Sequence, residues 1–397
     1  MSRQKTYLDY AATTPLDSNV LKKMMPYLET KYGNPSSIHK FGQETSEAID
    51  MAREKVAKFL SCKATEIVFT GSASESDNLA IRGSIKALKR KKQAGDRVHI
   101  VTTKIEHKAV LETCKDLERD GVRVTYLPVG PDGLINLDDL RAEILPETDL
   151  VSVMYANNEV GAVQPIKKIG QIISDINKNK EHHTYFHVDA VQAANWLNCN
   201  VDELKIDLLT LSAHKIYGPK GVGILYVREG TPILPLITGG SHEWSLRAGT
   251  ENVAGIVGMG EAISKIKNTK AEFKKMEALK DKLVVGVIKN VQGSKVNAPR
   301  KPEDRLPNIV NFSFLGVEGE SLVITLDQEG FAVSTGSACT STALLPSHVL
   351  IAMGLIELDA HSSLRVSLGK YTTVAEIDRF IKVLPRVVDK LRKISGR

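Results

Sequence analysis

Lys215 is the residue of this sequence that most directly suggests covalent chemistry. An apolar, strand-like run ends at Ser212, and His214, Lys215 and a Gly-Pro turn follow at once. A lysine in such a turn can present its amine to a carbonyl compound with little backbone in the way. The chemistry that this arrangement suggests is a Schiff base with pyridoxal phosphate, which also needs an acid beside the pyridine nitrogen and donors for the phosphate.

A candidate for that acid follows the preceding strand. Residues 185–188 read as a buried strand, and Asp189 and Gln192 come directly after it. In open α/β sheets, ligands bind at the carboxyl ends of the strands. Taken alone, Lys215 could be one of many solvated surface lysines. An acid at the end of a neighbouring strand favours the cofactor site.

The stretch from Gly71 to Asn78 is a candidate phosphate cradle. It follows a predicted strand at 66–70 and precedes a helix expected from about Leu79. Small residues there, among them Ala73 and Ser74, would place backbone N–H groups and the positive end of a helix dipole near an anion. The alternative is an ordinary serine N-cap.

The order of these and further motifs resembles that of the cysteine desulfurases of the NifS/IscS type, which are pyridoxal-phosphate enzymes. The resemblance covers nearly the whole chain. It is carried by Asp9-Tyr-Ala-Ala-Thr-Thr-Pro15, Ser72-Ala-Ser-Glu-Ser-Asp-Asn78, Glu106-His107-Lys108, Asn157-Asn-Glu159, His187-Val-Asp-Ala-Val-Gln192, Ser212-Ala-His-Lys215, Arg247-Ala-Gly-Thr250, Gly336-Ser-Ala-Cys-Thr-Ser341 and Leu364-Arg-Val-Ser-Leu-Gly369.

The resemblance implies a role for each matching residue. Lys215 would bind the cofactor covalently and carry protons, and His107 would stack on the ring and act as an acid or base. Asp189 would keep the pyridine nitrogen protonated. The remaining cofactor contacts implied are Asn158 and Gln192 on the phenolic oxygen, Ala73, Ser74, Ser212 and His214 on the phosphate, and Thr250 on the phosphate of a neighbouring subunit.

Cys339 and Arg365 would act on the substrate. Cys339 lies among small residues in a segment expected to be exposed, although a free cysteine is more often a small buried hydrophobe. By resemblance its thiolate would take the sulfur of L-cysteine as a persulfide and leave L-alanine. Arg365, on a predicted strand, suits bidentate capture of the substrate carboxylate, with Asn158 beside it; a surface arginine is the alternative.

The fold implied is that of a pyridoxal-phosphate transferase of fold type I, an α/β protein. We expect a large domain with a mostly parallel seven-stranded sheet at 14–262, and a small α+β domain made of 1–13 and 263–397. A length of 397 residues agrees with two domains. Within the second half, 253–290 reads as one long helical stretch that links them.

Composition excludes several classes of protein. No apolar run approaches the roughly 20 residues of a membrane span, and no signal peptide is evident, so we expect a cytoplasmic protein. The four cysteines are scattered without zinc-type spacing, so no metal site is expected. A net charge of +6 is modest, and the lysines at 86–92 read as a solvated helix face rather than a nucleic-acid site.

Alternatives of two kinds remain open. One keeps the fold and cofactor but changes the reaction to that of an aminotransferase, a selenocysteine lyase or a kynureninase-like enzyme; the other is a non-enzymatic scaffold or a nucleotide-binding α/β protein. The expected partners are L-cysteine, a second copy of the chain and a sulfur acceptor for iron–sulfur cluster assembly or tRNA thiolation. Many relatives extend beyond the point where this chain ends, so docking of an iron–sulfur scaffold is a hypothesis.

Overall fold

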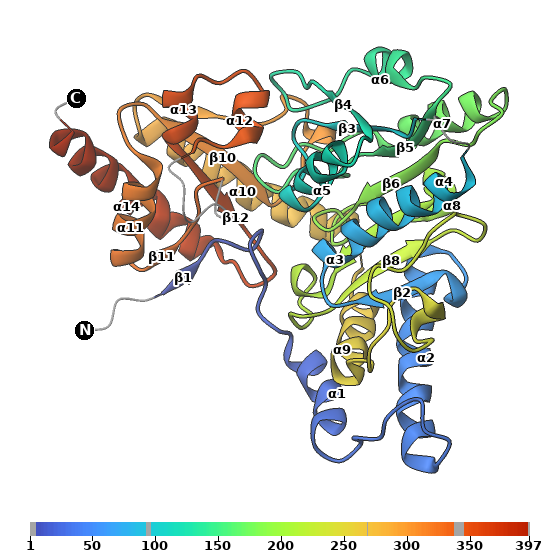
Figure 1. Cartoon of the computed structure of the whole chain (residues 1–397). Coiled ribbons are helices and arrows are strands. Elements are labelled where there is room, and N and C mark those ends of the chain that lie inside the picture. Colours follow the sequence, from blue (N-terminus) through green and yellow to red (C-terminus); the bar gives the residue numbers. More distant parts are fainter. Residues whose placement is uncertain (1–4, 93–96, 268, 337–344, 396–397) are drawn as a thin grey trace.

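The computed structural model describes residues 5–92, 97–267, 269–336 and 345–395. Figure 1 shows two groups of elements: strands β2 to β8 with helices around them, and a second group with β1, β9 to β12 and α11 to α14. The strands are β1 (Thr6–Tyr7), β2 (Ile67–Thr70), β3 (His99–Thr103), β4 (Arg123–Leu127), β5 (Thr148–Ser152), β6 (Tyr185–Asp189), β7 (Leu208–Ser212), β8 (Gly223–Val227), β9 (Ser294–Val296), β10 (Ile309–Phe314), β11 (Phe331–Ala332) and β12 (Ser363–Ser367).

The helices alternate with the strands through most of the chain. They are α1 (Ser18–Glu29), α2 (Lys40–Leu60), α3 (Ala73–Asn78), α4 (Ser84–Lys91), α5 (Lys108–Arg119), α6 (Leu137–Glu143), α7 (Ile166–Asn177), α8 (Val201–Leu204), α9 (Val253–Ser264), α10 (Lys270–Asn290), α11 (Gly319–Gln328), α12 (His348–Ala352), α13 (Glu357–His361) and α14 (Val374–Ile394). A π-helical turn at Leu79–Gly83 joins α3 to α4.

The large sheet confirms the expected fold class. In the described part of the chain it has seven strands in the order β2-β8-β7-β6-β5-β3-β4. The strands from β7 to β4 pair in parallel, and β8 is antiparallel to both of its neighbours. Asp189 at the end of β6 pairs in register with Thr210 of β7. The carboxyl ends of β6 and β7 therefore lie side by side, as a strand-end site requires.

The segment with Lys215 begins and ends on the same rung of this sheet. Ser212, the last residue of β7, pairs with Gly223, the first residue of β8. The loop 213–222 leaves the sheet and returns to it between these two residues.

The second group of elements is built around a three-stranded antiparallel sheet, in the order β12-β10-β9. The N-terminal segment joins this group, because β1 pairs in parallel with β11 and Asp9 forms a bridge to Ser367. Its buried core includes Phe312, Phe331 and Phe380. The exact domain boundaries expected from the sequence stay a prediction.

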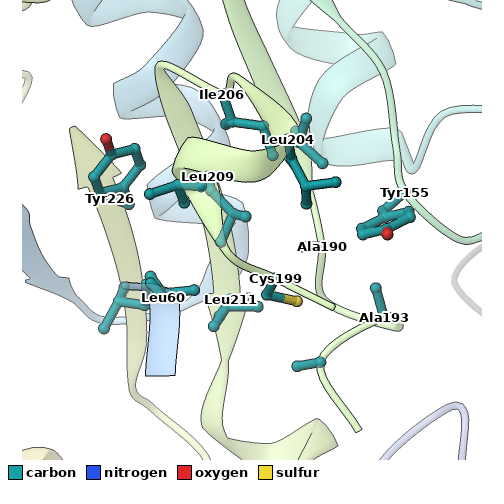
Figure 2. Close-up of a cluster of buried hydrophobic side chains, with 14 of the residues drawn as sticks. Leu60, Tyr155, Ala190, Ala193, Cys199, Leu204, Ile206, Leu209, Leu211 and Tyr226 are labelled. Atoms are coloured by element: carbon teal, nitrogen blue, oxygen red, sulfur yellow. The ribbon is translucent and has the colours of Figure 1, made fainter. Parts of the chain in front are cut away.

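The core beneath the site consists of apolar residues from β6, β7, β8 and the segment after β6. Apart from the partly buried Tyr185, every residue of these strands is buried, as in central strands covered by helices. Figure 2 shows this packing around Cys199, with residues on both sides of the chain segment that follows β6. The labelled side chains are Leu60, Tyr155, Ala190, Ala193, Cys199, Leu204, Ile206, Leu209, Leu211 and Tyr226.

The helical stretch expected over 253–290 is divided into two helices. Two helices occupy this region, α9 and α10, and each packs against a different group. Helix α9 packs against α1 and α2 beside the large sheet, whereas α10 packs against α14. Thr269 accepts a hydrogen bond from the Glu272 amide and caps the start of α10. The helical pattern therefore contains an N-cap within it.

Candidate active site

The amine of Lys215 is held by the N-terminal segment. Its Nζ donates hydrogen bonds to the carbonyl oxygens of Ala11 and Ala12, at 2.6 and 2.7 Å. Gln192 Nε2 donates to the same Ala11 oxygen at 3.0 Å. Two residues expected at the cofactor thus converge on one carbonyl from a segment about 200 positions earlier. The amine is only partly buried, and so it can be reached.

Asp189 lies at the carboxyl end of β6 and is buried. Burial raises the pKa of its carboxyl, while His107 and Lys215 act in the opposite direction through their charges. The Val191 amide donates to Oδ1 at 3.0 Å. A buried carboxylate becomes more favourable when a cation lies beside it. The carboxyl of Asp189 therefore fits a ligand that presents a positively charged N–H.

His107 caps α5 with its ring. Nδ1 accepts a hydrogen bond from the Ala109 amide at 3.1 Å, so the proton of the neutral ring is on Nε2. The ring is half-buried, and its charge interacts with Asp189. The bond to Ala109 fixes the ring position, and the other nitrogen is the one that can exchange a proton.

The candidate phosphate cradle is the start of α3, six residues earlier than the sequence pattern suggested. Ser72 caps the helix through a 3.2 Å bond from the Glu75 amide. The amides of Ala73 and Ser74 belong to the first turn, where helices have no internal acceptors. Gly223 permits a close approach here, because a Cβ on it would lie 2.6 Å from the Ser72 carbonyl carbon.

Ser212 and His214 approach from the other side of the lysine. Ser212 ends β7 and is buried, and His214 Nδ1 lies 3.1 Å from Thr13 Oγ1. Burial and the charge of Lys215 lower the pKa of His214 to about 4, so it is neutral at pH 7. It can therefore donate or accept a hydrogen bond but adds no charge for a phosphate.

Arg365 is buried on β12 and bridges the two groups of elements. Nη1 donates to the Asn158 carbonyl oxygen at 2.9 Å, and Nη2 lies 2.8 Å from Asp9 Oδ1. Its Nε is buried without a hydrogen-bond partner in the described chain. A buried guanidinium donor without a partner is costly, which suits a residue that completes its bonds with a ligand. Arg365 and Asn158, both expected at the substrate, are thus in contact.

Two expected residues, Thr250 and Cys339, stay predictions. Thr250 is exposed in the single chain, although the nearby Arg247 forms an ion pair with Glu75 of α3 at 2.9 Å. Cys339 lies outside the described residues.

Sequence reasoning missed three buried titratable residues beneath the site: Asp77, Glu106 and His187. Burial raises the pKa of Asp77 well above its usual value, and the Asp189 carboxylate adds to this. Burial also raises the pKa of Glu106, to about 8. All three lie within the motifs quoted above, but the sequence around a single polar residue does not show whether its side chain is buried.

Within the described ranges, no group of three or more histidine, cysteine or acidic side chains could hold a metal ion. The same part of the chain contains no helix that is both long and apolar enough to cross a membrane.

The fold and the site are those of an aminotransferase-type enzyme. The family model described as Aminotransferase class-V matches residues 6–380, and the chain belongs to this family. Its relatives include the cysteine desulfurase IscS of Dictyoglomus turgidum, 51% identical over 99% of this chain and 97% of the relative. The cysteine desulfurase IscS of Methanosarcina thermophila is 46% identical over 98% and 93%. The resemblance to the cysteine desulfurases is confirmed.

Solved structures agree with this assignment. A NifS-like protein superposes with a TM-score of 0.89 at 40% identity, covering 98% of this chain and all of the other. SspA in complex with cysteine superposes with a TM-score of 0.79 at 38% identity, covering 94% of this chain and all of the other.

Proposed function

We propose that this protein is a cysteine desulfurase that removes sulfur from L-cysteine with bound pyridoxal phosphate. The observation that carries the proposal is the convergence of Asp189, His107 and Lys215 at the carboxyl ends of β6 and β7. Relatives named cysteine desulfurase, and a similar structure with cysteine bound, support it. None of the alternative reactions is favoured by a specific contact.

The residues present fit the cofactor. Lys215 would bind the aldehyde carbon of the cofactor, and Asp189 would contact its pyridine nitrogen. A protonated nitrogen beside Asp189 would lower the pKa of this carboxyl, which burial raises. When bound, the cofactor supplies an electron sink for bonds broken at the substrate's carbon atoms. The other contacts proposed are Gln192 and Asn158 at the phenolic oxygen, and Ala73, Ser74, Ser212 and His214 at the phosphate.

Lys215 is the proposed proton carrier, and His107 is the proposed contact with the cofactor ring. The Lys215 amine has two carbonyl acceptors at Ala11 and Ala12, which hold it as an ammonium donor when it is not bonded to a ligand. A lysine that alternates between these acceptors and the substrate can carry a proton. His107 would lie over the ring, and its Nε2 is the nitrogen that could exchange a proton.

Cys339 is the proposed nucleophile. Burial raises the pKa of each of the other thiols, at Cys62, Cys114 and Cys199, to about 12, so they stay protonated at pH 7. Because the thiolate is the nucleophile, these three are poor candidates. The Cys339 thiolate would take the substrate sulfur atom as a persulfide, the electron pair of the broken C–S bond would stay with the β-carbon, and a proton delivered to that carbon would give L-alanine.

Partners follow from the proposed chemistry. The persulfide requires an acceptor, for which an iron–sulfur scaffold or a tRNA-thiolation protein is the proposed class. We further propose a homodimer in which Thr250 reaches the neighbouring subunit's phosphate. A cytoplasmic location stays a prediction, as does the lack of direct nucleic-acid binding.

The test is parallel measurement of L-alanine and sulfide from L-cysteine with a thiol reductant, for the wild type, Cys339→Ala and Cys62→Ala. We expect equal amounts of both products from the wild type and the Cys62 variant. Cys339→Ala should lose both while it keeps the visible absorption of bound cofactor. Alanine formation by Cys339→Ala would refute the role of Cys339, and none from any of the three would refute desulfuration.

A further inference from the structure

A cavity of about 500 Å³ has Ile216 and Tyr217, the two residues that follow Lys215, in its wall. Its walls come from the start of α1, the turn after Lys215, the end of α9, α10 and the loop before α14. Its volume is in the range of small-molecule sites, which commonly lie where two parts of a protein meet. No residue assigned to the proposed reaction lines it.

The floor of the cavity is apolar. It includes Val20, Ile216, Met276 and Leu279, all of which are buried. Two flat side chains, Trp196 and Tyr217, also line it and are partly exposed. Aromatic faces beside an aliphatic floor suit a flat apolar body.

The rim is positively charged. Four lysines line the cavity against two acids, Asp17 and Glu272. The negative charge of Asp17 is balanced by two of these lysines, since Lys370 Nζ lies 2.7 Å from Oδ2 and Lys265 Nζ lies 3.5 Å from Oδ1. The other two lysines, Lys267 and Lys275, are exposed and form no ion pair among the residues that the structure describes. Their charges are available to an anion.

Two residues of the cavity wall, Asn195 and Tyr217, are hydrogen-bonded to Lys215 and to the 11–14 segment that holds its amine. Asn195, in the wall, donates from Nδ2 to the Lys215 carbonyl oxygen at 2.8 Å. Tyr217, also in the wall, has a φ of 64°, which is unfavourable for a residue with a side chain. Its amide donates to Thr14 Oγ1 at 2.8 Å, and its carbonyl oxygen accepts from the Asp17 amide at 3.0 Å.

We propose that this cavity is a second ligand site, for a small organic anion with a flat apolar body, and that its occupancy is transmitted to Lys215. The anionic group lies at Lys267 and Lys275, and the ring lies over the apolar floor beside Trp196 and Tyr217. A ligand that presses on the 215–217 turn changes how the 11–14 segment holds the amine. The site is separate from that of the proposed reaction.

The probe for the test is anilinonaphthalene sulfonate, a flat aromatic sulfonate whose fluorescence rises in apolar surroundings. It is titrated into the cofactor-loaded enzyme, and Lys275→Glu is compared with Lys274→Glu. Both lysines are exposed on α10, but Lys274 does not line the cavity. We expect saturable binding that Lys275→Glu weakens about three- to tenfold, since a charge reversal replaces attraction by repulsion. Lys274→Glu should bind as the wild type does.

Equal affinities for the two variants, or no saturable binding, would overturn the proposal. Binding by the cofactor-free protein that vanishes on loading would place the probe in the cofactor site and would overturn it too. For the coupling, the visible spectrum of the bound cofactor should change with the same dissociation constant as the fluorescence. A spectrum that stays constant at saturation would refute transmission to Lys215.

Discussion

Oδ1 of Asp77 lies 3.6 Å from Nε2 of His187, and both side chains are almost completely buried. Burial lowers the pKa of His187 to about 3 and raises that of Asp77 well above its usual value. His187 is therefore neutral at pH 7, and the pair is not an ion pair. Neutral hydrogen bonds hold His187 instead, at 2.9 Å to Ser152 Oγ and 3.2 Å to Thr210 Oγ1.

The neutral state of His187 predicts a pH dependence of stability. Between pH 7 and pH 5 the unfolded chain binds a proton at this histidine, with an ordinary pKa of about 6.5, whereas the folded chain does not. The free energy of unfolding should fall by about 2 kcal/mol over this interval from His187 alone. His187→Asn should remove that part of the decrease, as measured by urea unfolding at pH 7, 6 and 5.

The raised pKa of Asp77 acts with the opposite sign, since its contribution to stability is lost as the pH rises above about 4. The comparison of variant with wild type isolates His187. The exposed His182 supplies the control variant, His182→Asn. If the free energy of unfolding fell equally with pH in the wild type and in His187→Asn, His187 would not titrate as described.

Lys215→Arg should abolish covalent attachment of the cofactor, because a guanidinium forms no Schiff base under these conditions. The loss of a proton carrier alone should lower kcat by about 10²- to 10⁴-fold. Borohydride reduction followed by peptide mass analysis measures the attachment. Lys220→Arg, at an exposed lysine of the same loop, should keep both attachment and activity. Cofactor trapped on another lysine in the wild type would contradict the assignment.

Arg365→Lys should raise KM for L-cysteine more than it lowers kcat. A lysine can keep one contact with Asp9 or Asn158 but cannot supply a guanidinium Nε–H. The loss of a charge-assisted hydrogen bond, about 1.5–3 kcal/mol, corresponds to roughly a 10- to 100-fold rise in KM. Steady-state kinetics at saturating cofactor measure it, with the exposed Arg386→Lys as control. An unchanged KM would exclude Arg365 from substrate binding.

Thr373→Ala should loosen the first turn of α14. Thr373 Oγ1 accepts from the Glu376 amide, and Glu376 Oε2 accepts from the Thr373 amide at 2.8 Å, which completes a capping box. Loss of an N-cap costs about 1 kcal/mol, or roughly a fivefold faster amide exchange in that turn. Hydrogen exchange measures it. Thr30→Ala, at the C-terminal end of α1, is the control. Equal amide exchange rates in the first turn of α14 for the two variants would contradict the role of the cap.

The elements predicted best are those that can be recognised from the pattern of their own residues. In the sequence, residues 108–119 read as an amphipathic helix and residues 309–314 as a strand, and α5 and β10 have these bounds. Apolar periodicity marks the helix, and alternation marks the strand. Lys215 and Asp189 could be singled out because each directly follows an apolar strand run.

The rest of the site depends on contacts between residues distant in the sequence. The carbonyls of Ala11 and Ala12 meet Lys215 across some 200 residues, and nothing in their own neighbourhood marks them as acceptors. Helix α3 begins at Ala73, before the expected Leu79, because polar residues such as Asp77 are buried there and do not show the apolar periodicity that marks a helix. Burial of such residues depends on the tertiary structure, and local propensity does not show it.

Because Ser212 and Gly223 pair with each other, the length of the lysine loop between them does not affect the register of β7 and β8. Gly221 is exposed, and a Cβ added to it would meet no atom within 4 Å, so an extra residue there would lengthen the loop without shifting either strand by one position. The Gly221 turn of this loop is thus a place where the chain can accept insertions, tags or labels while both anchors keep their partners.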